Sequence, residues 1–262
     1  MKISIIGAGA MGGSLAEGLL KTDLLQAGDI TVADPTQGVL DRFAAEGVSV
    51  TTDNNVAVVG ADIVMVVVKP WIVEQVLEGV KASLDYDKQV LVIIAAGVSS
   101  DSIRTWLDKD GAVPHFFLAI PNIGIAEKAS MTFLVPVGAT QAETRRMTDI
   151  FEQLGGALVT EERLLASGTT LASCGIAYAM RYIRASVEGG VELGFKAADA
   201  TKIVLQTVEG AVRLLQASGE HPESAIDKVT TPGGVTIKGL NAMEHYGFTN
   251  AVIEGLKAGA KA

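Results

Sequence analysis

The stretch Lys2-Ile-Ser-Ile-Ile-Gly-Ala-Gly-Ala-Met-Gly-Gly13 decides how the amino-terminal half of the chain folds. Its isoleucines predict a short buried β-strand, and the apolar periodicity of Ser14–Leu20 predicts a helix soon afterwards. Between them Gly7, Gly9 and Gly12 follow the G-x-G-x-x-G spacing of dinucleotide-binding turns. The stretch therefore predicts a strand, a glycine turn and a helix that together bind a dinucleotide.

The three glycines are expected to serve different purposes. Gly7 allows the tight turn, Gly9 lets a pyrophosphate approach the backbone, and Gly12 lets the helix pack close to the strand. The N–H groups of Ala10 and Met11, at the start of the helix, would then face the phosphates at the positive end of the helix dipole. Because glycines also serve ordinary tight turns, the strand-to-helix context carries this prediction.

Composition argues against several classes of protein. The net charge of −9 disfavours nucleic acid or an anionic membrane as partner, because both attract clustered Lys and Arg. Cys174 is the single cysteine, which excludes an internal disulfide and favours a reducing, cytoplasmic location. No secretory leader is expected, and no apolar run reaches the length of a membrane span. Only 19% of residues are charged, which suggests that much surface is buried, for example between subunits.

Residues 1–160 alternate between strand-like and helix-like segments. Strands are expected at 3–6, 30–34, 48–50, 62–68, 89–97, 112–120, 130–137 and 157–159, with helices near 14–20, 38–46, 71–83, 99–109 and 140–153. The continuous apolar run 62–68 is typical of a parallel strand that is covered on both faces. We therefore expect an α/β domain of two βαβ halves with one extra strand, helix and strand.

Residues 161–262 show no convincing strand and are expected to form a helical domain. The uncharged stretch 164–180 predicts a buried helix. Asp199 is expected to cap the helix that runs to about Ser218. The other helices are expected over 174–194, 237–245 and 249–261.

Asp34 ends the second predicted strand, about twenty residues beyond the glycine turn, where an acidic residue binds the ribose 2′-hydroxyl in NAD-binding domains. A phosphate on that oxygen would be repelled, and no Lys or Arg follows before Arg42. Asp34 therefore favours NADH, although Thr36 and Gln37 could donate hydrogen bonds to a phosphate. The alternative is that Asp34-Pro35 forms only a turn.

Three other segments are expected at the carboxyl ends of central strands, where open α/β sheets bind ligands. Lys69 follows the 62–68 strand, and Pro70 holds it in an extended conformation. Ala95 and Ala96 leave room for a flat ring or a sugar, and the Asn122 amide could meet a ligand. The alternatives are a solvated lysine at Lys69 and an ordinary turn at Asn122.

A second informative stretch, Thr230-Thr-Pro-Gly-Gly-Val-Thr236, precedes a predicted helix. The backbone N–H groups of Gly233 and Gly234, with the hydroxyls of Thr231 and Thr236, would suit a carboxylate. The alternative is a helix start with a threonine cap and a proline at the first helical position. That alternative leaves the two adjacent glycines unexplained.

The sequence favours neither a metal site nor a covalent nucleophile. His115, His221 and His245 have no Cys, Asp or His partner at ligand spacing. Cys174 lies in an apolar helical stretch without an activating partner and is predicted to be a core residue. His221 precedes a proline and is expected to cap a turn.

Over essentially its whole length the chain resembles the pyrroline-5-carboxylate reductase family. The resemblance rests on Gly7–Gly12, Val68–Pro70, Ala95–Val98, Pro121–Asn122, Gly219–Pro222 and, most specifically, Val229–Glu244. Two segments depart from the family pattern. Ile120-Pro-Asn-Ile-Gly124 stands where the family usually reads Met-Pro-Asn-Thr-Pro, and Leu171-Ala-Ser-Cys-Gly-Ile-Ala-Tyr178 stands where it reads Ser-Gly-Ser-Gly-Pro-Ala-Tyr.

The resemblance implies a Rossmann domain, a helical dimerisation domain and an active site between them. It implies that the helices of two subunits interlace into a homodimer, and that larger rings of dimers occur. The implied reaction is hydride transfer from NADPH or NADH to the cyclic imine pyrroline-5-carboxylate, and the family leans towards NADPH.

For site residues, the resemblance implies that Thr231, Gly233 and Gly234 hold the substrate carboxylate. Thr236 would hydrogen-bond the imine nitrogen. Lys69, Ala95, Ala96 and Asn122 would line the nicotinamide side.

Two other functions share parts of these patterns. A β-hydroxyacid dehydrogenase would have the same glycine turn and a following helical domain. It would need a catalytic lysine on the first long helix, where 174–194 offers only Arg181 and Arg184 as bases. A non-catalytic dinucleotide sensor would keep the glycine turn without needing a carboxylate cradle.

Overall fold

The computed structural model describes residues 1–260, which divide into two compact units. The first unit is Met1–Ser173, and the second runs from Cys174 to the end of the described residues. The change of composition in the sequence comes slightly earlier, after residue 160.

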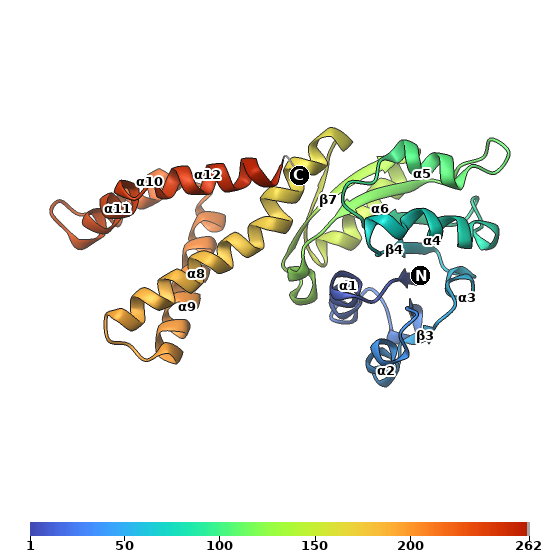
Figure 1. Cartoon of the computed structure of the whole chain (residues 1–262), viewed down its shortest axis with the longest axis horizontal. Helices are drawn as coiled ribbons and strands as arrows, with labels where there is room; N and C mark the ends of the chain where they lie inside the picture. The colour runs from blue at the N-terminus through green and yellow to red at the C-terminus, as the bar shows by residue number, and fades with distance from the viewer. Residues whose placement is uncertain (261–262) are drawn as a thin grey trace. The chain divides into compact units, whose positions relative to one another are not determined.

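One eight-stranded sheet forms the centre of the first unit (Figure 1). Its strand order is β3-β2-β1-β4-β5-β6-β7-β8, and every neighbouring pair is parallel except β6 and β7. This confirms the mostly parallel α/β domain that the alternating pattern predicts. The strands are β1 Ile3–Ile6, β2 Ile30–Ala33, β3 Ser49–Thr51, β4 Ile63–Val66, β5 Val90–Ile93, β6 Phe116–Ile120, β7 Ser130–Val137 and β8 Gly155–Val159.

The strand expected over 112–120 begins only at Phe116. Pro114 has no N–H to donate to the ladder, and Asp110 and Gly111 both adopt positive φ in the turn before it. Apolar character alone therefore overestimated the length of β6.

Helices cover both faces of the sheet. They are α1 Ala10–Leu20, α2 Gln37–Ala45, α3 Asn54–Val58, α4 Val73–Val80, α5 Ser100–Leu107 and α6 Gln141–Glu152. The short helix α3 was not predicted; Asp53 caps it by accepting a hydrogen bond from the Asn55 N–H. Single 3₁₀ turns span Ala27–Asp29, Pro70–Ile72, Lys81–Ser83, Ile123–Glu127 and Glu162–Leu164.

Side chains alternate between the two faces with the period of a strand. Ile3 and Ile5 of β1 join the core under α1, α2 and α6, where Leu15, Phe43 and Phe151 are fully buried. Ile6 belongs to the opposite core, under α4 and α5. Both faces are therefore closed to water, as the continuous apolar strands require.

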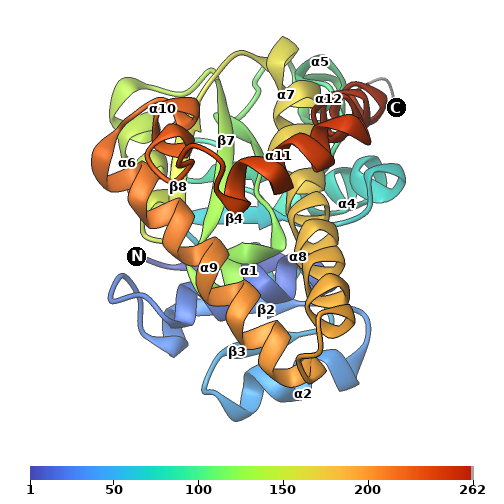
Figure 2. The ribbon, with the colours of Figure 1, turned by 90° about the vertical axis from the view of Figure 1, so that its left-hand side faces the viewer.

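The second unit is entirely helical within the described residues (Figure 2). Its elements are α8 Gly175–Glu192, α9 Ala197–Ser218, α10 Pro222–Asp227, α11 Val235–His245 and α12 Phe248–Gly259. Of the helix expected over 249–261, residue 261 lies outside the described residues. His221 caps α10 as expected, by accepting a hydrogen bond from the Glu223 N–H. The cap predicted at Asp199 is wrong, because Lys196 is the N-cap of α9 and Asp199 lies in its first turn.

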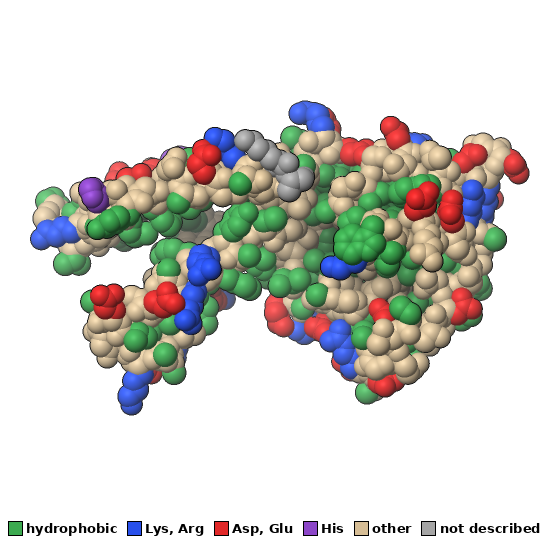
Figure 3. Space-filling view, in the orientation of Figure 1, with side chains coloured by type: hydrophobic (Ala, Val, Ile, Leu, Met, Phe, Trp, Pro, Cys, Tyr) green, Lys and Arg blue, Asp and Glu red, His purple; other side chains and the backbone are tan. Residues whose placement is uncertain are grey.

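Apolar side chains are unusually exposed in the helical unit (Figure 3). Only Val187 and Ala200 are buried among its described residues. The uncharged stretch 164–180 is helical, formed by α7 (Leu165–Gly168), a π-helical turn over Thr169–Cys174 and the start of α8. Its predicted burial is wrong for the single chain, since the side chains of Leu171 and Met180 are 62% and 53% exposed. Cys174, predicted to be a core residue, is half-buried.

None of the helices in residues 1–260 has both the length and the apolar character needed to cross a bilayer.

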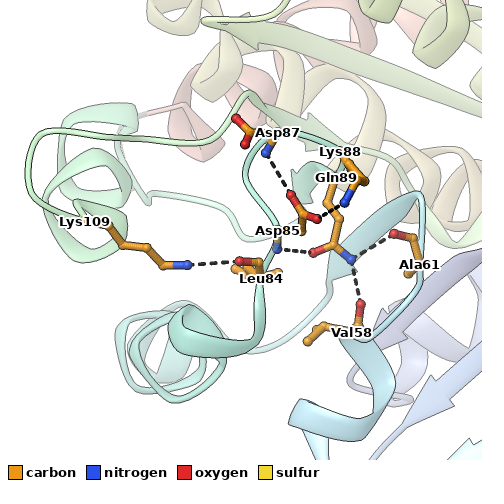
Figure 4. Close-up of polar contacts among 8 residues, drawn as sticks. All are labelled: Val58, Ala61, Leu84, Asp85, Asp87, Lys88, Gln89 and Lys109. Atoms are coloured by element: carbon orange, nitrogen blue, oxygen red, sulfur yellow. Dashed lines mark hydrogen bonds and ion pairs between the residues drawn. The ribbon is translucent and has the colours of Figure 1, made fainter.

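A buried glutamine, Gln89, lies just before the interior strand β5 and bonds the loops around it (Figure 4). The Gln89 side chain is 4% exposed and donates to the carbonyl oxygens of Val58 and Ala61, at 2.6 and 2.8 Å. Its own oxygen accepts from the Asp85 N–H at 2.9 Å. One side chain thus satisfies backbone groups from two loops that have no strand partner there. Outside it, Lys88 donates to the Asp85 carboxylate and lowers the pKa of that carboxyl.

We expect Gln89→Met to lower the free energy of unfolding by about 2 kcal/mol, because it keeps the side-chain volume but leaves buried backbone groups without partners. The matched control is Lys88→Met, which removes only a surface ion pair and should leave the urea midpoint nearly unchanged. Urea unfolding curves of the two variants and the parent measure both effects. Equal stability of the Gln89 variant and the parent would contradict this role.

Candidate cofactor cleft and carboxylate turn

A cleft of about 870 Å³ opens at the carboxyl ends of the central strands. Strand order reverses between β1 and its neighbour β4, so the loops that follow these strands diverge and leave a crevice between them. Of the residues with a predicted cofactor role, Gly7, Gly9, Ala10, Met11, Asp34, Lys69, Ala95 and Ala96 line the cleft. Gly12 and Asn122 are not among its lining residues.

Gly7 is required by the turn itself. Its φ is +96°, and a Cβ there would lie 2.3 Å from the Val67 carbonyl oxygen. Gly12 is required by packing, because a Cβ on it would come 1.9 Å from the Gly7 carbonyl oxygen. These two glycines therefore bring α1 against the end of β1, as the spacing predicts.

Gly9 is different, because the protein itself does not demand a glycine there. It is the N-cap of α1 with φ −63°, and a Cβ would meet no atom within 4 Å. No side chain caps this end of the helix, so the first N–H groups face the cleft without a side-chain partner. Open space at Gly9 leaves room for a ligand that approaches the backbone closely, such as a phosphate.

The Asp34 carboxylate, just after β2, accepts a hydrogen bond from the backbone of the glycine turn. One carboxylate oxygen accepts from the Ala8 N–H at 2.9 Å, and the other accepts from the Thr36 N–H at 2.9 Å. The turn considered as the alternative for Asp34-Pro35 is therefore present, and the side chain also lines the cleft. Asp34 both shapes the glycine turn and brings negative charge to the cleft.

The electrostatic character of the cleft is set by few charges. Among the described residues that line it, Asp34 and Asp53 are acidic and Lys69 is the single cation. Lys69 is extended, with ψ 142°, as the following proline predicts. Arg42, the first cation after Asp34 in the sequence, lies outside the lining and pairs with Glu17 at 3.0 Å.

Sequence reasoning missed one wall of the cleft. Thr52, Asp53, Asn54 and Asn55 line it from the loop after β3 and the start of α3. The available signal in the sequence was Asp53 itself, because an Asp or Asn at a helix start is a common N-cap. Ile123 was also missed; it lines the cleft beside the expected Asn122.

In the second unit, Thr231–Gly234 forms a tight turn before α11. The Gly234 N–H donates to the Thr231 carbonyl oxygen at 2.9 Å, and Gly233 has φ +71°. Pro232 then Gly233 at the centre is the sequence of a type II turn. A Cβ on Gly234 would lie 2.5 Å from the Thr231 hydroxyl oxygen. The conformation of the turn itself therefore explains why both positions are glycine.

This turn replaces the capped start considered as the alternative. The N-cap of α11 is Gly234 rather than a threonine, and no side chain caps the helix. Thr231 and Thr236 are exposed on either side of the uncapped helix start. The Gly234 N–H that was expected to face a carboxylate is used inside the turn, by the Thr231 carbonyl oxygen. The geometry can still hold an anion, because exposed hydroxyls occur beside a helix start that no side chain caps.

Within residues 1–260 no three His, Cys, Asp or Glu side chains are grouped closely enough to hold a metal ion.

Two family models match the chain. The model described as pyrroline-5-carboxylate reductase dimerisation matches residues 162–262. The model described as NADP oxidoreductase, coenzyme F420-dependent, matches residues 2–97, which contain the glycine turn and most of the cleft.

Two relatives that match nearly the whole chain are both named pyrroline-5-carboxylate reductase. Pyrroline-5-carboxylate reductase 1 of Dictyostelium discoideum is 36% identical over 266 residues, which are 97% of this chain and 48% of that protein. Pyrroline-5-carboxylate reductase 2 of the same organism is 34% identical over 273 residues, covering 99% of this chain and 91% of that protein. The chain therefore spans about half of the first relative and nearly all of the second.

A solved structure has the same fold. The pyrroline carboxylate reductase of Plasmodium falciparum, with NADP bound, matches with a TM-score of 0.88, covering 100% of this chain and 96% of that one. Its sequence is 21% identical, so this likeness is one of fold.

The different reasons for Gly9 and Gly12 can be separated by experiment. Gly9→Ala should leave the thermal midpoint unchanged but weaken dinucleotide binding about tenfold, because the new methyl group occupies only the space left for the ligand. Gly12→Ala should instead destabilise the protein by about 2 kcal/mol through overpacking. Thermal unfolding without ligand and titration of NADH fluorescence measure the two effects. Unweakened binding by the Gly9 variant would exclude a close phosphate approach there.

Proposed function

The chain belongs to the pyrroline-5-carboxylate reductase family, and we propose that it reduces pyrroline-5-carboxylate to L-proline, the last step of proline biosynthesis. The bound dinucleotide supplies a hydride to the carbon of the C=N bond, while the ring nitrogen gains or already holds a proton. The protein must orient two flat molecules and stabilise charge, which requires neither a metal nor a covalent nucleophile. The observation that carries the proposal is the uncapped, threonine-flanked start of α11, which suits a carboxylate.

In this proposal Thr231, Gly233 and Gly234 bind the substrate carboxylate. The turn presents the Thr231 hydroxyl and the Gly233 N–H at the positive end of α11, while the Gly234 N–H donates to the Thr231 carbonyl oxygen and holds the turn. Thr236 lies in the first turn of the same helix and hydrogen-bonds the imine nitrogen. Its hydroxyl can accept from a protonated nitrogen or donate to a neutral one.

The cofactor lies in the cleft of the first unit. The start of α1, including Gly9, Ala10 and Met11, faces the pyrophosphate, and Gly7 and Gly12 shape the turn. Lys69, Ala95, Ala96 and the segment that begins at Asn122 form the nicotinamide side. Small side chains at Ala95 and Ala96 leave space for the ring.

Cofactor preference depends on the far end of the cleft. Asp34 and Asp53 favour an unphosphorylated ribose and hence NADH, since a 2′-phosphate would meet negative charge with Arg42 outside the lining. The family leans towards NADPH, and the family model for residues 2–97 is named for NADP. Both cofactors are therefore retained in the proposal, with Asp34 as the residue that biases the choice.

The dimerisation model over residues 162–262 supports a homodimer. Exposed apolar residues of the helical unit, such as Met180, Leu205, Leu214 and Val235, are the surface that a second copy would cover. A larger ring of dimers and a cytoplasmic location belong to the same proposal. Light scattering of the purified protein measures its mass directly.

One assay tests the activity against its rivals. Oxidation of NADH or NADPH, followed by absorbance, should depend on added pyrroline-5-carboxylate. A β-hydroxyacid dehydrogenase would instead turn over with a hydroxy acid and NAD(P)+. A dinucleotide sensor would bind the cofactor and oxidise none.

Thr236→Ala should lower kcat at least about tenfold, or about 1.4 kcal/mol of barrier, because the imine nitrogen loses its partner. Thr201→Ala is the matched control, since Thr201 is an exposed helical threonine of the same unit that bonds only its own helix. Steady-state rates with pyrroline-5-carboxylate measure both. Unchanged turnover of the Thr236 variant would remove Thr236 from the mechanism.

Asp34→Ser should shift the ratio of kcat/KM values for NADPH and NADH towards NADPH about tenfold, because negative charge at the 2′ position is removed. Asp34→Asn keeps an acceptor for the Ala8 N–H and separates the effect of charge from that of the bond. A ratio that neither variant shifts would show that Asp34 does not read the ribose.

A further inference from the structure

The amide of Asn122 is engaged on both sides within the protein. Asn122 follows β6 and is 7% exposed. Its Oδ1 accepts from the Gly124 N–H at 2.9 Å, and its Nδ2 donates to the Ala172 carbonyl oxygen at 3.4 Å. Its backbone N–H donates to the Ser130 hydroxyl at 3.0 Å. The side chain therefore links the end of β6 to a segment fifty residues later in the chain.

A second bond joins the same two segments. The Ser173 hydroxyl donates to the Pro121 carbonyl oxygen at 2.7 Å and is partly buried. Ala172 and Ser173 belong to the π-helical turn Thr169–Cys174, which leads into α8. Such turns are rare and often occur at functional sites. Two hydrogen bonds thus hold this turn against the end of β6.

Both segments depart from the family pattern at the positions that make these bonds. Gly124 stands where the family usually has a proline, which has no N–H to give to Asn122. When Ala177-Tyr178 is aligned with the Ala-Tyr that ends the family pattern, Ser173 stands at the first glycine of that pattern, and glycine has no hydroxyl for Pro121. The two departures therefore meet at one place and together make a single network.

The network also reaches the cofactor cleft. Asn122 caps the 3₁₀ turn Ile123–Glu127, whose first residue lines the cleft. The same turn lies against α1, since a Cβ on Gly18 would come 2.2 Å from the Ile125 carbonyl oxygen. A shift of Asn122 would consequently move a cleft wall and its contact with the phosphate-facing helix.

We propose that Asn122 is a positioning residue, which acts on the cofactor through Ile123 and is itself held by Gly124 and Ser173. The proposal rests on the proposed function only for the identity of the ligand as a nicotinamide dinucleotide. It changes the predicted role of Asn122 from a direct contact with nicotinamide to an indirect one. Both polar atoms of the amide bond to the protein, so the side chain acts by holding Ile123 in the cleft wall. Ser173 becomes part of cofactor binding although it does not line the cleft.

The test uses two variants that leave the Asn122 amide intact. Ser173→Ala removes the bond to Pro121. Gly124→Ala places a methyl group 2.8 Å from the present position of Asn122 Oδ1 and displaces that side chain. Each should weaken NADH binding about fivefold, the effect expected from one lost hydrogen bond. Asn122→Ala should do the same, and the double variant with Ser173→Ala should lose less than the product of the single effects.

NADH fluorescence titration of the whole protein measures this binding without any turnover, so a failed reductase assay does not affect the result. Where turnover is measured, KM for NADH should rise while kcat changes little. The matched control is Ser167→Ala, which changes an exposed serine of the preceding helix α7 and should leave NADH binding like that of the parent.

Two results would overturn the proposal. Weaker binding confined to the Asn122 variant, with Gly124→Ala and Ser173→Ala like the parent, would make Asn122 a direct ligand. Lower thermal midpoints with unchanged NADH affinity in all three variants would make the network purely structural.

Discussion

The close approach of α1 to the end of β1 is the constraint on which the cleft depends. Neither Gly7 nor Gly12 can carry a Cβ, because the Val67 and Gly7 carbonyl oxygens occupy the space. This contact aims an uncapped helix start at the point where strand order reverses. The segments that follow β2, β3, β4 and β5 then line a cleft around that helix end. Gly9 adds no constraint of its own and leaves the space a ligand needs.

Charge in the cleft follows from the same turn. Because Asp34 accepts the Ala8 N–H, the acidic group that would meet the ribose is fixed to the backbone that would meet the pyrophosphate. In the proposed function, cofactor choice and turn geometry would thus depend on the same carboxylate. Lys69, the single cation of the described lining, stands at the end of the neighbouring strand β4. The described lining of the cleft therefore carries few charges.

The helical unit is governed by a different constraint, which is the burial of apolar surface. Its helices leave most of their apolar side chains exposed in a single chain, which is costly in water unless another surface covers them. The family model for residues 162–262, a dimerisation model, fits this requirement. The carboxylate turn is carried by α11 of this unit, so the proposed chemistry depends on helices that need a partner for stability.

Local patterns in the sequence determined the eight strands, the glycine turn and the helical second half, because these depend on periodicity and on residues without a Cβ. Tertiary structure decided what depends on neighbours distant in sequence. Burial of 164–180 could not be predicted from its lack of charge, since burial requires a covering surface. From the sequence, the Asn122 amide could have met a ligand or formed an ordinary turn. In the folded chain it bonds to the Gly124 N–H and the Ala172 carbonyl oxygen. Spacing alone cannot show which polar groups meet across fifty residues.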